Sequence, residues 1–169
     1  MGKQPEFTWD EVSGICGCSI ILDNYLHGFG IAQCAEEDRD LISERVGARI
    51  AEARARINLL QNYKNYELWP GLKALKHLRS TMVQSKKHDP ESYERKRLNI
   101  EIRNMEKDIA DINIAIEGAK TQLYEYLHDL DKVNTRIRDT QHAGYQESDT
   151  ETLQKDIDVY RKFEKAEAN

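Results

Sequence analysis

The chain has 169 residues, of which 33% are charged and 8% are aromatic, and its formal net charge is −5. This mild negative charge excludes an overall electrostatic attraction to nucleic acid or to an anionic membrane. Three cysteines are an odd number without a regular framework, which argues against a secreted scaffold held by disulfides. We therefore expect a soluble, cytoplasmic protein that has no membrane segment.

The N-terminal segment, residues 1–35, is the most apolar part of the chain, and we expect it to be helical and to pack on a partner. Residues 8–11 have the form of a capping box at the start of a helix. The predicted helix ends at the Gly-Phe-Gly sequence of residues 28–30, because glycine readily terminates helices. Two glycines inside it disfavour a helix, so a short buried strand over residues 18–22 is the competing interpretation.

This segment also holds four residues that could bind a soft metal ion, although we expect no metal and no other cofactor. The four candidates are Cys16, Cys18, His27 and Cys34. Zinc sites use these residue types, but their close cysteine pair usually has a wider spacing than Cys16-x-Cys18. The simpler interpretation is three small buried side chains and one loop histidine.

A second helix is predicted from about residue 36 to residue 67, because apolar residues there alternate in steps of four and three. They are Val46, Ile50, Ala53, Ile57 and Leu60. Trp69-Pro70-Gly71 is predicted to end this helix, since proline removes an amide donor and restricts the residue before it. A shorter helix over residues 72–86 then completes a hairpin upstream of the central helix.

The central helix is predicted from about residue 90 to residue 141, and it carries the clearest pattern in the chain. Its apolar residues fall at the first and fourth places of successive heptads, which is typical of a coiled-coil seam. The seam consists of Leu98, Ile102, Met105, Ile109, Ile112, Ile116, Leu123, Tyr126, Leu130, Val133 and Ile137. Burial of such side chains contributes about 1.5–3 kcal/mol each, so the seam must lie against another helix.

The seam predicts an all-α fold: an elongated helical bundle or coiled coil over residues 36–141, with small helical ends. Arginines flank the seam of residues 46–60, and acidic residues flank the first half of the central seam, so we expect these two helices to pack together, within one chain or between chains. An in-chain bundle or an antiparallel pair avoids repulsion between acidic residues. Residues 142–169 are predicted to form a break followed by an amphipathic C-terminal helix.

The segment from residue 73 to residue 97 is basic, and it is the candidate site for an anionic partner. The positive residues are Lys73, Lys76, Arg79, Lys86, Lys87, Arg95, Lys96 and Arg97. Such a cluster can bind phosphates, but the segment has no interleaved stacking aromatics and no known nucleic-acid module. A solvated face, or a dock for an acidic helix of the same assembly, explains it as well.

The sequence has no nucleophile elbow, phosphate-binding glycine loop or dinucleotide fingerprint, so we expect no catalytic residues and no enzyme. The favoured function is a structural or adaptor protein that forms homo-oligomers or larger assemblies and bridges other proteins through its helices. The alternative is a small regulator or inhibitor that binds a nucleic-acid-handling complex through residues 73–97.

Overall fold

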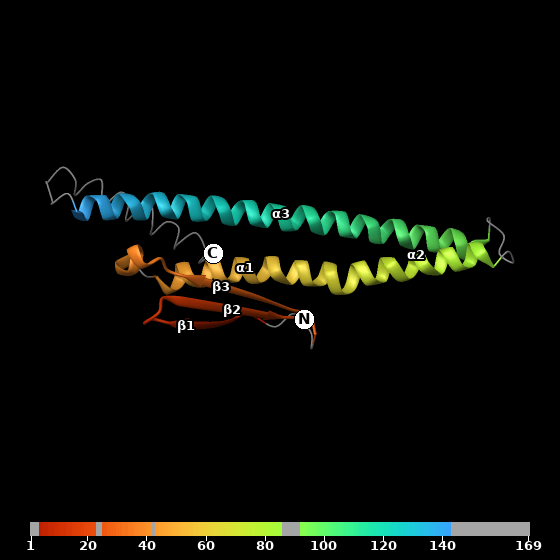
Figure 1. Ribbon diagram of the computed structural model, residues 1–169, viewed down its shortest axis with the longest axis horizontal. Helices are drawn as coiled ribbons and strands as arrows, with labels where there is room; N and C mark the ends of the chain where they lie inside the picture. The colour runs from red at the N-terminus through yellow and green to blue at the C-terminus, as the bar shows by residue number, and fades with distance from the viewer. Residues whose placement is uncertain (1–3, 23–24, 42, 86–91, 143–169) are drawn as a thin grey trace.

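The protein is an elongated rod with a small β-sheet at one end (Figure 1). The computed structural model describes residues 4–22, 25–41, 43–85 and 92–142. Two long helical stretches lie side by side along the rod, and the sheet covers one of them near the N-terminal end of α1 (Glu44–Tyr63). The fold is therefore mixed α and β, and the prediction of an all-α protein is wrong.

The sheet replaces the helix predicted in residues 1–35. Strands β1 (Glu6–Asp10), β2 (Ile15–Ile21) and β3 (His27–Gln33) form an antiparallel sheet in the order β1-β2-β3. In β2 the side chains of Cys16, Cys18 and Ile20 are buried. Burial at every second residue is the period of a strand, and a helix cannot produce it. The competing prediction of a strand over residues 18–22 overlaps the second half of β2.

The residues predicted to form a capping box lie instead in β1 and in the turn after it. The carboxylate of Asp10 accepts the N–H of Val12 at 3.0 Å and the hydroxyl of Ser13 at 2.6 Å. These hydrogen bonds lower the pKa of Asp10, the Ser13 hydroxyl having the largest effect. Gly14 then adopts a positive φ of 65°, a conformation that glycine allows and that turns the chain into β2.

Helix α1 (Glu44–Tyr63) packs closely on the sheet because both surfaces carry small residues. Ala51 and Ala55 have no exposed surface. A Cβ atom added to Gly30 would overlap the backbone of both alanines, and one added to Gly28 would lie 2.7 Å from the Cβ of Leu59. The Gly-Phe-Gly sequence of residues 28–30 therefore permits strand and helix backbones to touch, and it does not end a helix.

The helix does not stop at Trp69-Pro70-Gly71 as predicted. A π-helical turn, η2 (Lys64–Leu68), joins α1 directly to α2 (Trp69–Gln84), and the N–H of Trp69 bonds to the carbonyl of Lys64, five residues back. Pro70 lacks the amide hydrogen of a normal helical residue, and its ring crowds the preceding turn. The wider π turn places this proline at the start of α2, where it is tolerated.

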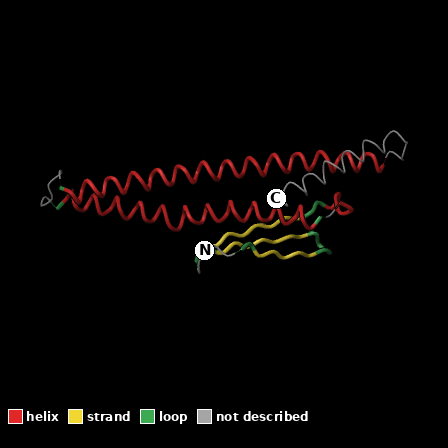
Figure 2. The backbone as a smooth tube through the Cα atoms, turned by 180° about the vertical axis from the view of Figure 1, so that it is seen from behind, coloured by secondary structure: helices red, strands yellow, loops and turns green. Residues whose placement is uncertain are grey.

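Helix α3 (Tyr93–His142) is the long central helix, and its 50 residues correspond to roughly 75 Å. It runs back along α2 and then α1, so the two stretches are antiparallel (Figure 2). Because of this direction the first half of α3 faces α2, and the salt bridge from Glu106 goes to Lys76 at 2.7 Å. The two helices pack together as predicted, but α1 contacts the second half of α3, whereas the acidic first half lies against α2.

The rod has two parts with different cores. We call the sheet, α1, residues 119–142 and the 3-10 helix η1 (Glu36–Leu41) the head, and η2, α2 and residues 93–118 the stalk. The head core is built mainly from small residues, namely Cys16, Cys18, Ile20, Ala32, Ile50, Ala51 and Ala55. The stalk core is built from larger aliphatic residues, namely Leu68, Leu72, Leu98, Ile102 and Ile109. The C-terminal segment predicted as an amphipathic helix lies outside the described residues.

Candidate interaction surface on the sheet

The face of the sheet turned away from α1 carries large apolar side chains that are exposed. Figure 2 shows the sheet lying on one side of the paired helices. Ile15, Phe29 and Ile31 lie on it, with exposed fractions of 36%, 56% and 62%. The strand register places Phe29 beside Ser19 and Ile31 beside Gly17, so the large side chains of β3 adjoin the small residues of β2. Clustered apolar side chains on a sheet face mark a surface that binds another protein more often than isolated ones do.

Side chains of α1 cover the free edge of β3 and hold this strand in place. The amide oxygen of Asn58 accepts the N–H of Phe29 at 3.0 Å. The amide nitrogen of Asn62 donates to the carbonyl of His27 at 2.7 Å, and Arg54 donates to the carbonyl of Ile31. These bonds block strand addition at this edge and make the exposed face rigid.

The opposite edge of the sheet, β1, is acidic. Glu6 and Asp10 stand at its two ends and are exposed, and the register places Glu6 beside Ser19. Charged residues on an edge strand disfavour pairing with an identical strand, because like charges would then meet. The face of the sheet, rather than either edge, is therefore the surface suited to association.

The predicted seam of α3 is closed within the chain. Buried seam residues are Leu98, Ile102, Ile109, Ile116, Val133 and Ile137, and the half-buried ones are Met105, Ile112, Leu123, Tyr126 and Leu130. On α1 the residues Ile50 and Ile57 are buried, and Val46, Ala53 and Leu60 are half-buried. A seam that the chain itself covers does not require a second copy, so association has to use another surface.

The four candidate metal ligands are not brought together. Cys16 and Cys18 lie under α1, whereas His27 lies on the outer face with its ring 4.8 Å from that of Phe29. The thiol of Cys34 donates to the carbonyl of Asp38 at 3.4 Å. Among the described residues no group of three or more His, Cys, Asp or Glu is arranged to hold a metal ion.

Burial keeps the cysteines as thiols. It raises the pKa of Cys18 to about 11, with a smaller contribution from the nearby carboxylate of Glu52. It also raises the pKa of Cys16 and of Cys34. Because the thiolate is the reactive and metal-binding form, these side chains act as small core residues at neutral pH.

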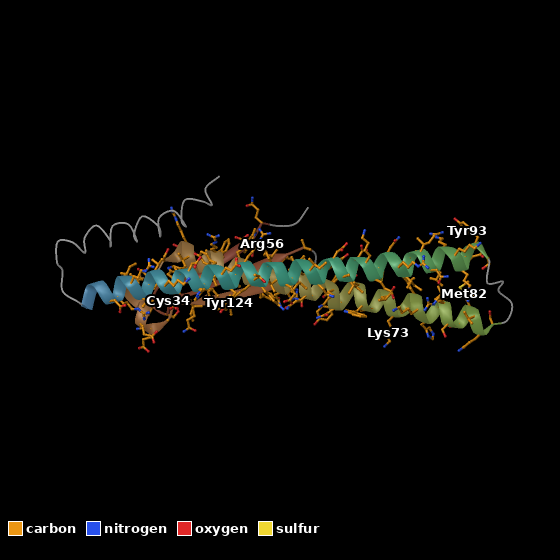
Figure 3. All side chains as sticks on the ribbon, turned by 90° about the horizontal axis from the view of Figure 1, so that it is seen from above. Cys34, Arg56, Lys73, Met82, Tyr93 and Tyr124 are labelled. Carbon is orange, nitrogen blue, oxygen red and sulfur yellow. The ribbon has the colours of Figure 1, made fainter. Side chains whose placement is uncertain are left out.

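The basic segment lies on the stalk, where acidic residues of α3 neutralise part of its charge. Lys76 pairs with Glu106, and Arg97 pairs with Glu101 at 3.0 Å. The pKa of Glu106 is lowered, chiefly by its hydrogen bond with Lys76. Lys73 is exposed on α2 (Figure 3). Lys96 is exposed, and Arg79 and Arg95 are half-buried, whereas Lys86 and Lys87 lie outside the described residues.

Sequence reasoning missed the residues of the exposed sheet face, because it placed Ile15 in a helix and interpreted residues 28–30 as the end of that helix. The signal that could have identified them is the alternation of Gly28, Phe29, Gly30 and Ile31. Two glycines at alternate positions define the face that touches a helix backbone. The large residues that alternate with them, Phe29 and Ile31, must then face outward.

A scan against protein-family models found no match, and searches of curated proteins and of solved structures found none either. No helix among the described ranges contains a stretch that is long and apolar enough to cross a membrane.

Proposed function

We propose that this chain is a non-enzymatic structural or adaptor protein whose head self-associates through the outer face of the sheet. The observation that carries the proposal is the exposure of Phe29 and Ile31 on a face held rigid by α1. Two antiparallel sheets commonly pack face to face about 10 Å apart, with their side chains interdigitating. The stalks would then remain available to bridge other proteins.

A second copy of the chain fits this face because the surface has a large and a small half. The large residues lie on β3, while β2 and β1 offer Gly17, Ser19 and Thr8 in register beside them. A two-fold axis parallel to the strands would stack β3 of one sheet on β1 of the other. Each large side chain would then meet small residues, as close packing requires.

Charge favours the same arrangement. It would bring the acidic residues of one β1, Glu6 and Asp10, near the partner strand β3, where Arg54 lies along the edge. The alternative two-fold axis, perpendicular to the strands, would stack the two acidic β1 strands on each other and would cause repulsion. Opposite charges at an interface mainly select the orientation of the partners rather than adding much affinity.

The test is the mass of the protein in solution, measured by light scattering and by analytical ultracentrifugation across micromolar concentrations. We expect the native chain to dimerise and the Ile31→Thr variant to dimerise at least tenfold more weakly. The reason is that each dimer loses the burial of two isoleucines, each contributing about 1–2 kcal/mol. A weak but specific dimer has a dissociation constant on the order of 100 µM. A native chain that stays monomeric at about that concentration overturns the proposal.

Ile114→Thr is the matched control, because Ile114 is also exposed but lies on the outer side of α3 in the stalk. This variant makes the same chemical change away from the sheet, so its dissociation constant should equal that of the native chain. Equal weakening by both substitutions would show that dimerisation does not use the sheet face.

The basic stalk supports the alternative function less well. Two of its positive side chains, Lys76 and Arg97, already have acidic partners on α3. Phosphate binding would have to compete with these ion pairs. The adaptor function is therefore the one we propose.

A further inference from the structure

A cavity of about 210 Å³ lies in the head, at the end of the sheet where η1, the first turn of α1 and the last third of α3 meet. Its lining combines apolar side chains, such as Ile50 and Leu130, with the indole of Trp9 and several polar groups. Cys34, beside this cavity, marks its place at the end of the molecule where α3 ends (Figure 3). The cavity is separate from the exposed face of the sheet, because Trp9 faces α1.

The most informative residue of the lining is Asn134 of α3. It is 8% exposed, and its amide nitrogen donates to a carboxylate oxygen of Asp38 at 3.1 Å. This bond fixes which end of the amide is the oxygen, and that oxygen has no hydrogen-bond partner among the described residues. A buried acceptor without a partner costs about 1–3 kcal/mol, so such a group in a native fold calls for a ligand or a water molecule.

A second acceptor beside it is also incompletely used. The other carboxylate oxygen of Asp38 is buried and accepts no hydrogen bond within the described chain, although Arg138 lies 3.4 Å away as an ion-pair partner. Both open groups are therefore acceptors, and a ligand must bring donors to them. Asp131 adds a further carboxylate to the lining, so the charged groups described here, Asp38 and Asp131 with Arg138 beside them, favour a cation.

The other walls indicate the shape of that cation. Ile50 and Leu130 suit an alkyl chain, and the face of an indole such as Trp9 attracts a positive charge. The first turn of α1 does not demand an anion, because the Ser43 side chain accepts the N–H of Val46 and Glu44 follows it. From this combination we infer that the head cavity binds a primary alkylammonium group, with its nitrogen between Asn134 and Asp38.

The cavity can be tested through its own fluorophore. The chain has two tryptophans, so a Trp69→Phe variant leaves Trp9, in the cavity wall, as the sole indole. This full-length variant is titrated with n-butylammonium, with 1-butanol and with butyrate at constant ionic strength. We expect a saturable change in Trp9 emission, with butylammonium binding at least ten times more tightly than butanol and with no binding of butyrate.

Two sources of the ammonium group are distinguished by a further probe, Nα-acetyl-lysine N-methylamide. Binding of this blocked lysine as well as butylammonium would assign the site to a lysine side chain of a polypeptide. Binding of butylammonium alone would assign it to a free amine. Equal affinity for butylammonium and butanol would show that the cavity does not recognise the ammonium group, and no saturable signal with either would leave water as its occupant. Either result overturns the inference.

Substitution of the key acceptor sharpens the test. Asn134→Leu keeps the branched shape of the side chain but removes its acceptor and its donor, so butylammonium should bind no better than butanol. Asn104→Leu makes the same change on an exposed part of α3 and should bind as the native chain does. Should circular dichroism show that Asn134→Leu does not fold, Asp131→Asn is used. This exposed substitution should weaken butylammonium about threefold and leave butanol unchanged. A folded variant that prefers butylammonium over butanol as strongly as the native chain does contradicts the site. Ile31→Thr, on the outer face of the sheet, should leave this preference unchanged.

Discussion

The head and the stalk use the same helix, α3, but are stabilised in different ways. In the head, α1 approaches the sheet so closely that Gly28 and Gly30 touch helix backbone. In the stalk, α2 and α3 pack through larger side chains such as Leu72 and Ile102. Contact between backbones therefore tolerates almost no increase in side-chain volume, whereas a seam between two helices can adjust by moving side chains.

The largest effect is expected from Gly30→Ala in the head. The added methyl group would overlap the backbone of Ala51 and Ala55, which cannot move aside as a side chain could. We expect the free energy of unfolding to fall by about 3 kcal/mol. Urea denaturation followed by circular dichroism measures it, and a loss below 1 kcal/mol would show that strand and helix are less tightly joined than described.

The next effect is a loss of stability at alkaline pH that arises from Cys18. Its folded pKa of about 11 lies above the ordinary value of 9.0, so the folded chain keeps this proton while the unfolded chain releases it. The contribution is complete below pH 9 and is lost as the pH rises to 11, by about 2 kcal/mol. Since lysines and tyrosines also titrate there, the comparison is between the native chain and Cys18→Ala, whose stabilities should converge between pH 8 and pH 11.

A smaller change of opposite sign is expected from Gly118→Ala on α3. A Cβ atom at this position would meet no atom within 4 Å, and Gly118 lies inside a helix. Alanine should raise the free energy of unfolding by about 0.5–1 kcal/mol, through helix propensity and the less flexible unfolded chain. Thermal unfolding measures this gain in stability. Together with Gly30→Ala, the substitution makes the same chemical change in the head and on the exposed side of α3. Destabilisation here would reveal a tight contact on this side of α3.

The smallest effect is expected from Glu106→Gln in the stalk, which removes the ion pair with Lys76. The two side chains are 44% and 46% exposed, so salt screens the pair. Because the pKa of Glu106 is lowered in the folded chain, its stabilising effect is present near neutral pH and is lost as the pH falls below the ordinary carboxyl range. A slightly lower melting temperature at low salt, vanishing at 1 M salt, is the expected result.

The long helix could be predicted from the sequence because its heptad pattern extends over the whole of α3. The sheet could not, because several of its inward residues, among them Cys16, Cys18, Gly28 and Gly30, are too small to register as an apolar pattern. The role of the two glycines depends on Ala51 and Ala55, whose backbone lies against them. Likewise, nothing in the chain near Asn134 indicates that Asp38 will lie beside it, since the two are far apart in sequence and meet only when α3 folds back.

The π turn of η2 also keeps the inward residues of α1 and α2 on the same side of the rod, where they face α3. The inward residues of α1 end at Leu60, and strict heptads would place later ones at positions 64, 67 and 71. The stalk instead uses Leu68, Leu72 and Leu75, one residue later. A turn that takes up one extra residue cancels this offset, so both halves still face α3. Insertions elsewhere would rotate one half away from its neighbour, which makes this short segment the place where the length of the chain can vary by a single residue.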